Sequence, residues 1–530
     1  MTSDLHHELA EDHPTLLGAI APARQILLIA ALAGLLLGWL TTHTDIFFAD
    51  GLRYISQARA IDRGSAVEGL KNAVDHPVYP LAIAAVHRVT GGNDPHAWQV
   101  AAQLASSLAG VILVLPLYLV NRELFGERAA VAGCLLFYAV PLTGHVFADT
   151  LSESTFLLFW LTGLWAALRF IKSGRVAWIP LVLVGSALAY LTRPEGLLLP
   201  AAVVTTLVLS PRWVLGGLGK RGVIIVGLLV IGAAVLVGPY VLMKGGLGTK
   251  PSVARLLGTA PRSAAHAVER QKPLAFNQSL SKTYVLAVKA VEKAVNDAVG
   301  LPLLIFAVPG IVLTRPREGA IRQWKLLAVI AVASLLALIR LHATGGYCSP
   351  RHAILLSTIL IPAAASGVYR LTSIAAGHLG KGWTRAAVAL RVVILIALLL
   401  PQMGETLSPL NDGLRGYRDA GVWLTERGEH HGKVVDVTGW SQFYSGRTGY
   451  TFADLISATD DPDSRWVVVR EAHLVGPWDY CRRLRTLVDG LTPVVVFPGE
   501  TGPRRTRVLV FDRSTIKSVR RRGDAGTVRR

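Results

Sequence analysis

The sequence predicts an all-α polytopic membrane domain of about eleven transmembrane helices, followed by a small extracytoplasmic α/β domain. Two observations lead to this prediction. Of the 530 residues, 52% are hydrophobic and only 17% are charged, whereas soluble domains carry about 25% charged residues. Apolar runs of roughly 15 to 22 residues also recur along the chain, each about long enough to cross a bilayer core of about 30 Å. An ordinary cytosolic enzyme does not fit these features.

Eleven apolar runs are the expected spans, and each should be helical because backbone polar groups cannot stay unpaired against lipid. They cover residues 25–44, 100–120, 129–148, 154–171, 177–191, 196–209, 222–242, 299–314, 325–341, 352–369 and 386–402. The pair at 177–209 has two short halves, separated only by TRPEG. Residues 1–24 then form a cytoplasmic N-terminal segment, and residues 25–403 form the transmembrane domain.

The net charge of +19 reflects 54 Lys and Arg against 35 Asp and Glu. In a soluble protein this excess would suggest a nucleic acid partner. Here the basic residues lie mainly in short loops between apolar runs, and such loops stay in the cytoplasm. The charge therefore indicates topology and no nucleic acid partner. The N-terminus is expected inside, and the C-terminus outside with the loops at 45–99 and 243–298, the corner at 143–153, and the TRPEG and YCSPRH turns.

After residue 403 the composition becomes that of a soluble protein. The short β-branched runs KVVDV, RWVVVRE, PVVVF and RVLVFD predict an α/β domain over residues 404–515. The basic segment 516–530 is expected to be a disordered tail. Three cysteines without CxxC spacing predict neither a disulfide framework nor a zinc site: Cys134, Cys348 and Cys481. No glycine-rich nucleotide-binding motif is present.

The first polar segment beyond the membrane is FFADGLRYISQARAI. Asp50 lies where the chain leaves the first span, and Arg53 and Tyr54 follow about one helical turn later, on the same face if a helix begins there. A carboxylate fixed at a membrane surface can act as a general base toward a hydroxyl or help to hold a metal. A structural role for Asp50, capping an interfacial helix, stays open.

The same loop contains DHPVYP, in which two prolines bracket a turn. His76 or Asp75 could contribute a proton or a ligand, and Tyr79 is a further substrate-binding candidate. The alternative is that the prolines only set the entry angle of the following helix.

Two acids lie four residues apart in HVFADTLSEST, Asp149 and Glu153. On one helix they would share a face, where like charges destabilise unless a cation, hydroxyl or substrate lies between them. The alternative is N-capping of the next span by Asp149 or Ser152, with Glu153 in its first turn.

Two later turns offer cations at the same side. In LTRPEG, Arg193 could present its guanidinium to a phosphate, or it could snorkel to the interface with Glu195 as its counter-ion. In GGYCSPRH, Arg351 and His352 open a span beside Tyr347, and a helix start favours anions. A carboxylate together with arginines at one membrane surface is suited to transfer from a lipid phosphate.

In this order, these segments resemble the GT-C membrane glycosyltransferases, in particular the bacterial branch related to protein O-mannosyltransferases and to the aminoarabinose and RgtA/B/C/D-type transferases. The resemblance covers about residues 25–370. DGLRYISQA, from Asp50 to Ala58, is similar to the family's first-loop motif D-E-x-x-Y-x-x-x-A, and HPVYPL resembles its H-P-P-x-Y-P element. LTRPEGLLL and GYCSPRH are similar to segments of its later loops.

The resemblance implies a multi-pass protein of the bacterial cytoplasmic membrane that transfers a hexose or pentose, with inversion, from a polyprenyl-phosphate donor. The acceptor would be a lipid, polysaccharide or protein outside the cytoplasm. Asp50 would be the general base, and Arg193 and Arg351 would contact the lipid phosphate. The other substrate-binding candidates are Arg53, Tyr54, His76, Tyr79, Asp149, Glu153, Glu195, Tyr347 and His352.

One position departs from the family. Gly51 stands where the motif has its second acidic residue, and no D-x-D is present. A divalent cation therefore stays open as a cofactor, with no metal ligand assigned.

Three other functions remain open. A transporter or flippase of lipid-linked glycans would place ionisable residues near the midplane and often shows repeated halves, whereas the acids here lie at the ends of clean apolar runs and no repeat is visible. A glycan polymerase or ligase would use the outer arginines without needing Asp50. A catalytically inert scaffold would follow if Gly51 marks a decayed site.

Overall fold

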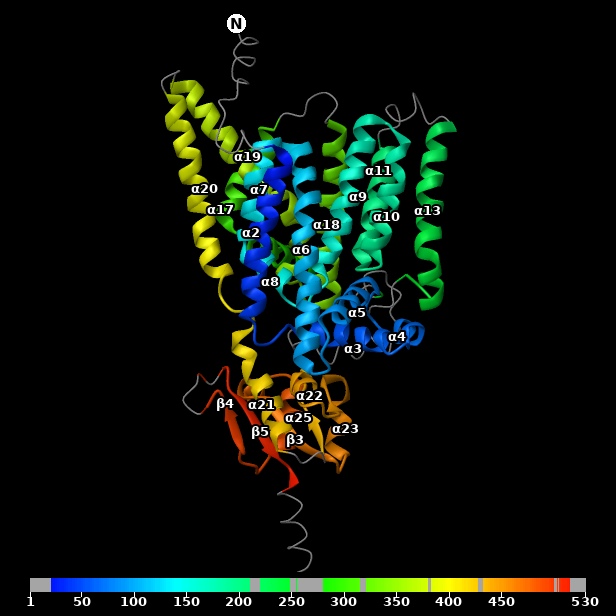
Figure 1. Ribbon diagram of the computed structural model, residues 1–530, viewed down its shortest axis with the longest axis vertical. Coiled ribbons are helices and arrows are strands. Elements are labelled where there is room, and N and C mark those ends of the chain that lie inside the picture. The colour runs from blue at the N-terminus through cyan, green and yellow to red at the C-terminus, as the bar shows by residue number, and fades with distance from the viewer. Residues whose placement is uncertain are drawn as a thin grey trace, which may run out of the picture.

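The computed structural model describes residues 21–209, 220–247, 254, 280–314, 321–379, 383–427, 432–499, 503 and 505–514. It consists of a long helical bundle with a small α/β domain beneath one end (Figure 1). The start of the first bundle helix and the C-terminal domain lie at opposite ends of the molecule. This agrees with the predicted division into a membrane domain and a C-terminal domain.

The bundle helices follow the predicted apolar runs. They are α2 (Pro22–Thr42), α6 (Pro95–Phe125), α7 (Glu127–Ala139), α8 (Pro141–Ala148), α9 (Glu153–Ser173), α10 (Ile179–Tyr190), α11 (Leu198–Val208), α13 (Lys220–Lys244), α16 (Leu280–Val299), α17 (Leu301–Val312), α18 (Ile321–Gly345), α19 (Ile354–Leu379) and α20 (Thr384–Thr406). Prolines open several of them, where a missing N–H costs nothing.

Seven helices in the described part of the chain are long and apolar enough to cross a membrane. Two further bent pairs, α7 with α8 at 67° and α16 with α17 at 95°, raise this number to nine. The segments around α10 and α11 are shorter apolar helices. Helices therefore occupy all eleven predicted runs, while eleven full crossings stay a prediction.

Small residues let bundle helices approach closely, as membrane helices require. A Cβ on Gly310 of α17 would lie 1.8 Å from the carbonyl oxygen of Ala363 on α19. A Cβ on Gly367 would lie 2.0 Å from the carbonyl oxygen of Phe306. At this crossing only glycine allows backbone contact, and the crossing supports α19, the helix that follows Arg351.

The loop predicted at 45–99 is largely helical. It forms α3 (Asp50–Asp62), α4 (Ala66–Asn72) and α5 (Val78–Thr90), which lie between the bundle and the C-terminal domain (Figure 1). The loop predicted at 243–298 also contains a helix, α16, which packs against α18 and the turn before α19. From the sequence alone, α16 is assigned to a charged loop because this helix contains several lysines. Most of this loop's remaining residues lie outside the described ranges.

The C-terminal domain holds one mixed five-stranded sheet with the order β2-β1-β3-β5-β4. Its elements are α21 (Arg415–Glu426), β1 (Lys433–Val435), α22 (Trp440–Ser445), β2 (Gly449–Tyr450), α23 (Leu455–Asp460), β3 (Ser464–Arg470), α24 (Glu471–Val475), α25 (Asp479–Val488), β4 (Val495–Phe497) and β5 (Val508–Asp512). Strand β1 is parallel to β2 and β3, and β5 is antiparallel to β3 and β4.

Strands form at each of the four β-branched runs, so the α/β domain is confirmed. Strand β2 was not predicted because it has only two residues, Gly449–Tyr450. The tail 516–530 lies outside the described residues.

The first loop (residues 45–99) and the C-terminal domain share one hydrophobic core. The cluster joins residues 46–105 to residues 417–510, and its large members include Phe47, Tyr54, Tyr79, Trp98, Tyr417, Trp440, Tyr444 and Trp466. Phe47 lies edge-on to Phe443 at 5.3 Å. Because each side supplies half of this core, the loop that begins with α3 is fixed by residues almost 400 positions later in the chain.

Candidate active site

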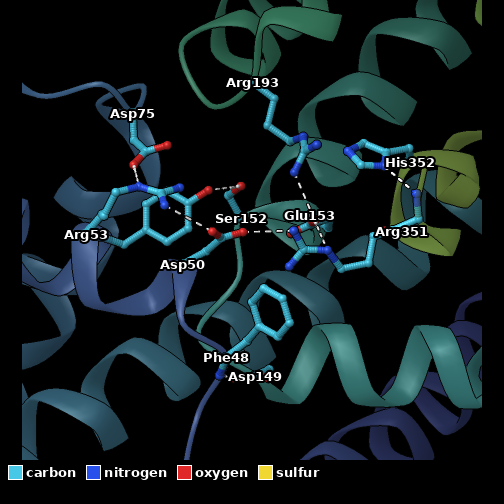
Figure 2. A network of polar contacts seen from close by, with 12 residues as sticks. Phe48, Asp50, Arg53, Asp75, Asp149, Ser152, Glu153, Arg193, Arg351 and His352 are labelled. Atoms are coloured by element: carbon cyan, nitrogen blue, oxygen red, sulfur yellow. Dashed lines mark hydrogen bonds and ion pairs between the residues drawn. The ribbon is translucent and has the colours of Figure 1, made fainter. Parts of the chain in front are cut away.

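A network of charged side chains lies where the bundle meets the first loop (Figure 2). It draws on the start of α3, the loop before α5, the start of α9, the turn after α10 and the turn before α19. Figure 2 shows Asp50 between Arg53 on one side and Arg351 on the other, with Glu153 and Arg193 beyond Arg351. The network joins Asp50, Arg53, Asp75, Glu153, Arg193, Glu195 and Arg351.

Asp50 is the first residue of α3 and contacts two arginines. Its Oδ1 lies 3.1 Å from Arg53 Nη1, and its Oδ2 accepts a hydrogen bond from Arg351 Nη2 at 2.9 Å. The N-cap of α3 is Ala49, and no side chain caps this helix start. The capping role for Asp50 is therefore wrong, and its carboxylate, 27% exposed, belongs to a long-range ion network.

Gly51 has a packing role in this structure. A Cβ at this position would lie 2.6 Å from Phe47 Cδ2 and 2.7 Å from Thr150 Cγ2. Real Cβ atoms do not approach other atoms so closely, so a carboxylate side chain could fit only if the corner at Thr150 moved. This explains the departure from the D-E pair without decay of the site.

Arg53 links Asp50 to the next loop, because its Nε donates to Asp75 Oδ2 at 2.8 Å. Partial burial lowers the pKa of Arg53, but the hydrogen bond and charge of Asp75 and the charge of Asp50 outweigh this and raise it. Arg53 thus stays a cation that orients Asp50.

The other residues of the first loop lie behind this pair. The Tyr54 hydroxyl is 3.1 Å from Ser152 Oγ. Tyr79 is fully buried, donates to the carbonyl of Ala102 at 3.0 Å, and packs edge-on against Tyr54. His76 is buried edge-on against Tyr190 at 5.0 Å. The structure thus contradicts direct substrate contact by Tyr79, whose hydroxyl is used within the fold, and places His76 in an aromatic cluster.

Glu153 joins two arginines that are 158 residues apart in the chain. It is 1% exposed, and its Oε1 lies 2.9 Å from Arg193 Nη1 and 3.6 Å from Arg351 Nε. Arg193 also contacts Glu195 at 3.0 Å. Burial disfavours the charged form of Arg193, but Glu195 and Glu153 outweigh this and raise its pKa. The buried acid therefore keeps two guanidinium groups side by side (Figure 2).

Arg351 is the central member of the network. Its guanidinium stacks over the Phe48 ring at 4.5 Å, while two of its nitrogens contact Asp50 and Glu153. Its third nitrogen, Nη1, is buried and has no hydrogen-bond partner among the described residues. Buried donors are normally satisfied, so this nitrogen is available to an anion.

His352 does not serve as a second cation at this helix start. Its Nδ1 accepts a hydrogen bond from the backbone N–H of Ser349 at 3.1 Å, which closes a capping box. A nitrogen that accepts cannot carry the second proton. Tyr347 is 57% exposed and lies edge-on to the partly exposed His352 at 5.7 Å, so it is the more accessible of the two.

Asp149 and Glu153 do not share a helix face, because α8 ends before Asp149 and α9 begins only at Glu153. The N-cap of α9 is Ser152, without a side-chain cap bond. The prediction that treated both acids as one helical pair is wrong, and so is the capping alternative for Asp149.

Asp149 is instead buried and holds neighbouring segments together by hydrogen bonds. Its Oδ1 accepts from the backbone N–H groups of Phe48 at 2.9 Å and Thr150 at 2.7 Å, and its Oδ2 accepts from Asn411 Nδ2 at 2.9 Å. Burial raises the pKa of Asp149 to about 6, although these three donors and Arg351 oppose the shift.

Three residues of the site were not predicted from the sequence: Phe48, Ser152 and Asn411. Each acts through a contact with a distant segment. Phe48 and Ser152 lie inside the polar segments FFADGLRYISQARAI and HVFADTLSEST, and this position is the one signal the sequence offers, whereas Asn411 lies in neither segment.

The described residues do not fit a divalent cation. In the described ranges, no group of three or more His, Cys, Asp and Glu side chains could hold a metal ion. Both Asp50 oxygens face guanidinium groups, and Gly51 leaves no room for a second carboxylate. No step of the chemistry below is assigned to a metal.

Residues 74–238 match the family model described as dolichyl-phosphate-mannose-protein mannosyltransferase. No curated protein sequence matches the chain. ArnT from Cupriavidus metallidurans bound to undecaprenyl phosphate is similar in structure, with a TM-score of 0.55 and 15% identity, over 93% of this chain and 98% of that one. The Archaeoglobus fulgidus oligosaccharyltransferase tethered with an acceptor peptide has a TM-score of 0.55 and 12% identity, over 90% and 73%.

The archaeal oligosaccharyltransferase AglB from Archaeoglobus fulgidus in complex with an inhibitory peptide and a dolichol-phosphate has a TM-score of 0.53 and 13% identity, over 88% of this chain and 72% of that one. At such identities the structural likeness establishes the shared fold, and the matched segment covers α5 to α13. The chain therefore has the fold of these membrane glycosyltransferases, and residues 74–238 are similar to the mannosyltransferase family model.

Proposed function

We propose that this protein transfers a hexose or pentose from a polyprenyl-phosphate donor to a hydroxyl of an extracytoplasmic lipid, polysaccharide or protein, with inversion at the anomeric carbon. The single observation that carries the proposal is the meeting of Asp50 and Arg351 at 2.9 Å. These residues are 301 positions apart, and Arg351 Nη1 lies buried beside them with no hydrogen-bond partner in the part of the chain that the structure describes. A base and an anion-binding group thus lie together.

Asp50 acts as the general base in this proposal. The acceptor hydroxyl oxygen attacks the anomeric carbon as its proton passes to Asp50, and the bond between that carbon and the phosphate oxygen breaks. The electron pair leaves with the phosphate, so one displacement inverts the configuration. Contacts with Arg53 and Arg351 orient the two carboxylate oxygens of Asp50, and a carboxylate oxygen can accept the proton of the hydroxyl.

Arg351 and Arg193 receive the phosphate. Negative charge grows on this group as it leaves, and preorganised cations stabilise that charge most where water is excluded. Glu153 holds both guanidinium groups in place, and the exposed Tyr347 could contact the sugar or its lipid. Two GT-C neighbours were solved with lipid phosphates, ArnT with undecaprenyl phosphate and AglB with dolichol-phosphate. Their ligands support the choice of donor class.

The proposed location is the bacterial cytoplasmic membrane, with the N-terminus inside and the C-terminal domain outside. The basic short loops of the sequence support this orientation. The site then faces the outer surface, where a lipid-linked donor and a large acceptor can both reach it.

The test is sugar transfer by the purified protein from a panel of radiolabelled polyprenyl-phosphate sugars. We expect release of label by the wild type and loss of roughly 100-fold or more in Asp50→Asn, which removes the base with little change of size. The matched control is Asp62→Asn. Asp62 lies at the other end of α3, pairs with Arg88 at 2.9 Å, and has the same 27% exposure as Asp50.

An EDTA lane tests the metal separately, and we expect unchanged transfer. No release from any donor by the wild type would overturn the proposal in favour of a transporter. Equal activity of Asp50→Asn and Asp62→Asn would remove Asp50 from the mechanism.

A further inference from the structure

Asn411, in the connection between the last bundle helix and the C-terminal domain, has an unusual backbone. Its φ is +54°, and in the part of the chain described it is the only residue other than glycine with a positive φ. This conformation is costly for most side chains, although Asn tolerates it better than others. Such a residue persists only where its surroundings hold it, and these positions concentrate at functional sites.

The Asn411 amide bridges the first loop and the corner between α8 and α9. Its Nδ2 donates to the carbonyl of Ile46 at 3.2 Å and to Asp149 Oδ2 at 2.9 Å. Asp149 in turn accepts from the N–H of Phe48 at 2.9 Å. One side chain near the C-terminal domain therefore fixes the backbone on both sides of Phe47.

This backbone leads directly into the catalytic helix. The first turn of α3 begins at Phe48, whose carbonyl accepts from the N–H of Gly51 at 2.9 Å. The Phe48 ring also carries the Arg351 guanidinium, 4.5 Å away, which contacts Asp50. Asn411 thus reaches Asp50 through the helix start and through the Phe48–Arg351 stack. Figure 2 shows Asp149, Phe48, Arg351 and Asp50.

Helix α21, which follows this connection, holds the loop at one more residue, Asp45. Arg418 Nη1 donates to Asp45 Oδ1 at 2.6 Å, and Arg415 contacts Asp45 Oδ2 at 3.1 Å. These arginines belong to α21, whose buried face enters the core shared with the first loop. The residues before Asp50 are therefore fixed from the C-terminal side along their whole length, from Asp45 to Phe48.

We propose that Asn411 is a positioning residue for Asp50, and that the C-terminal domain completes the active site by holding the start of α3 through the Asn411–Asp149 pair. This inference rests on the proposed function. It gives the domain a role in the chemistry that involves no substrate contact.

The pair needs Asp149 as a carboxylate, since it accepts three N–H donors and donates to none. The other ionisable groups that face it are Arg351, Tyr79 and Tyr444. The burial that raises the Asp149 pKa to about 6 places its protonation within reach of an enzyme assay.

The experiment compares Asn411→Gly, Asn411→Asp and the control Asp412→Asn in the full-length protein. Glycine accepts the positive φ but has no amide. The carboxylate variant keeps the shape but repels Asp149 when both are ionised. Asp412 is the exposed neighbour. The measurements are kcat and KM from pH 5 to 8, thermal stability, and binding of undecaprenyl phosphate.

For Asn411→Gly we expect kcat to fall roughly tenfold to 100-fold, because a catalytic group misplaced by about 1 Å loses activity on that scale, while undecaprenyl phosphate still binds. For Asn411→Asp we expect a comparable loss at pH 8. This loss should shrink below pH 6, where one proton shared with Asp149 restores a hydrogen bond. The wild type should change in the opposite direction and lose activity on acidification.

Asn411 variants with the same kcat and KM as Asp412→Asn would overturn the inference. Loss of undecaprenyl phosphate binding together with loss of thermal stability in both variants would also overturn it, because Asn411 would then maintain the fold only. An inactive wild type would overturn the proposed function and this inference with it, whereas an active wild type with silent Asn411 variants overturns the inference alone.

Discussion

Two buried carboxylates of this protein have opposite surroundings. Asp436, in the C-terminal domain, is fully buried and accepts four hydrogen bonds from Thr438 and Ser441, through the backbone N–H and the hydroxyl of each. Glu153, at the start of α9, is 1% exposed and contacts Arg193 and Arg351 by ion pairs. Neither Glu153 oxygen accepts a well-aligned hydrogen bond from the described residues.

The comparison separates a structural acid from a functional one. The partners of Asp436 lie within five residues, so a local turn satisfies it completely. The partners of Glu153 come from 40 and 198 positions away and carry full charges. Hydrogen bonds to near neighbours, as at Asp436, close a local turn. Ion pairs with distant arginines, as at Glu153, hold cations in place for a role beyond local stability. The predictions below test that division, from the largest expected effect on sugar transfer to the smallest.

Glu153→Gln should reduce transfer roughly 100-fold, because the two guanidinium groups lose their common anchor and a misplaced group costs activity on this scale. Transfer and thermal stability of the purified protein are the two measurements, and we expect the stability to change little by comparison. Equal losses in both would place Glu153 with the structural acids.

Arg351→Lys should raise KM for the lipid donor roughly tenfold, since an ammonium cannot reproduce the fork geometry of a guanidinium and loses a charged hydrogen bond. Initial rates at varied donor concentration measure this. Arg169→Lys is a control near the opposite end of α9, where Arg169 lies 3.5 Å from Glu123. A normal donor KM in Arg351→Lys would remove the phosphate contact.

Acidification should halve kcat/KM near pH 6, where Asp149 becomes protonated. The sign for stability is opposite. The folded pKa is raised above the usual value of 3.8, so the folded protein binds this proton more tightly than the unfolded chain does, and stability falls as the pH rises from about 4 to about 6. A pH profile of transfer checks the prediction. In Asp149→Asn the decrease of kcat/KM near pH 6 should vanish, and activity should stay low at every pH. An unchanged decrease would assign this titration to another group.

Asp436→Asn should leave transfer almost unchanged at permissive temperature and lower the free energy of unfolding by about 1–3 kcal/mol, because an amide cannot accept all four hydrogen bonds. Hydrogen exchange over residues 432–499 measures the local loss. A selective loss of transfer without faster exchange would contradict the structural role of Asp436.

The sequence was sufficient to predict the helical bundle, the α/β domain and most charged residues of the network. Apolar run length and β-branched runs are local signals, and Asp50, Arg193 and Arg351 were recognisable at span ends. Their pairing was not predictable, because Asp50 and Arg351 meet only through tertiary packing across 301 positions. The spacing of Asp149 and Glu153 misled because the helix breaks between them. Asn411 belongs to no motif, and its φ is a property of the folded chain.

The core shared by the first loop and the C-terminal domain also bears on how the chain folds during synthesis. Synthesis proceeds from the N-terminus, and residues 46–105 leave the ribosome more than 300 residues before their packing partners at 417–510. Until those partners arrive, α3 can pack against α5 and α6, but the side of this core that the C-terminal domain covers stays open. A chain that ends before residue 411 would therefore carry Asp50, Arg193 and Arg351 without the contacts that hold the start of α3 from the C-terminal side.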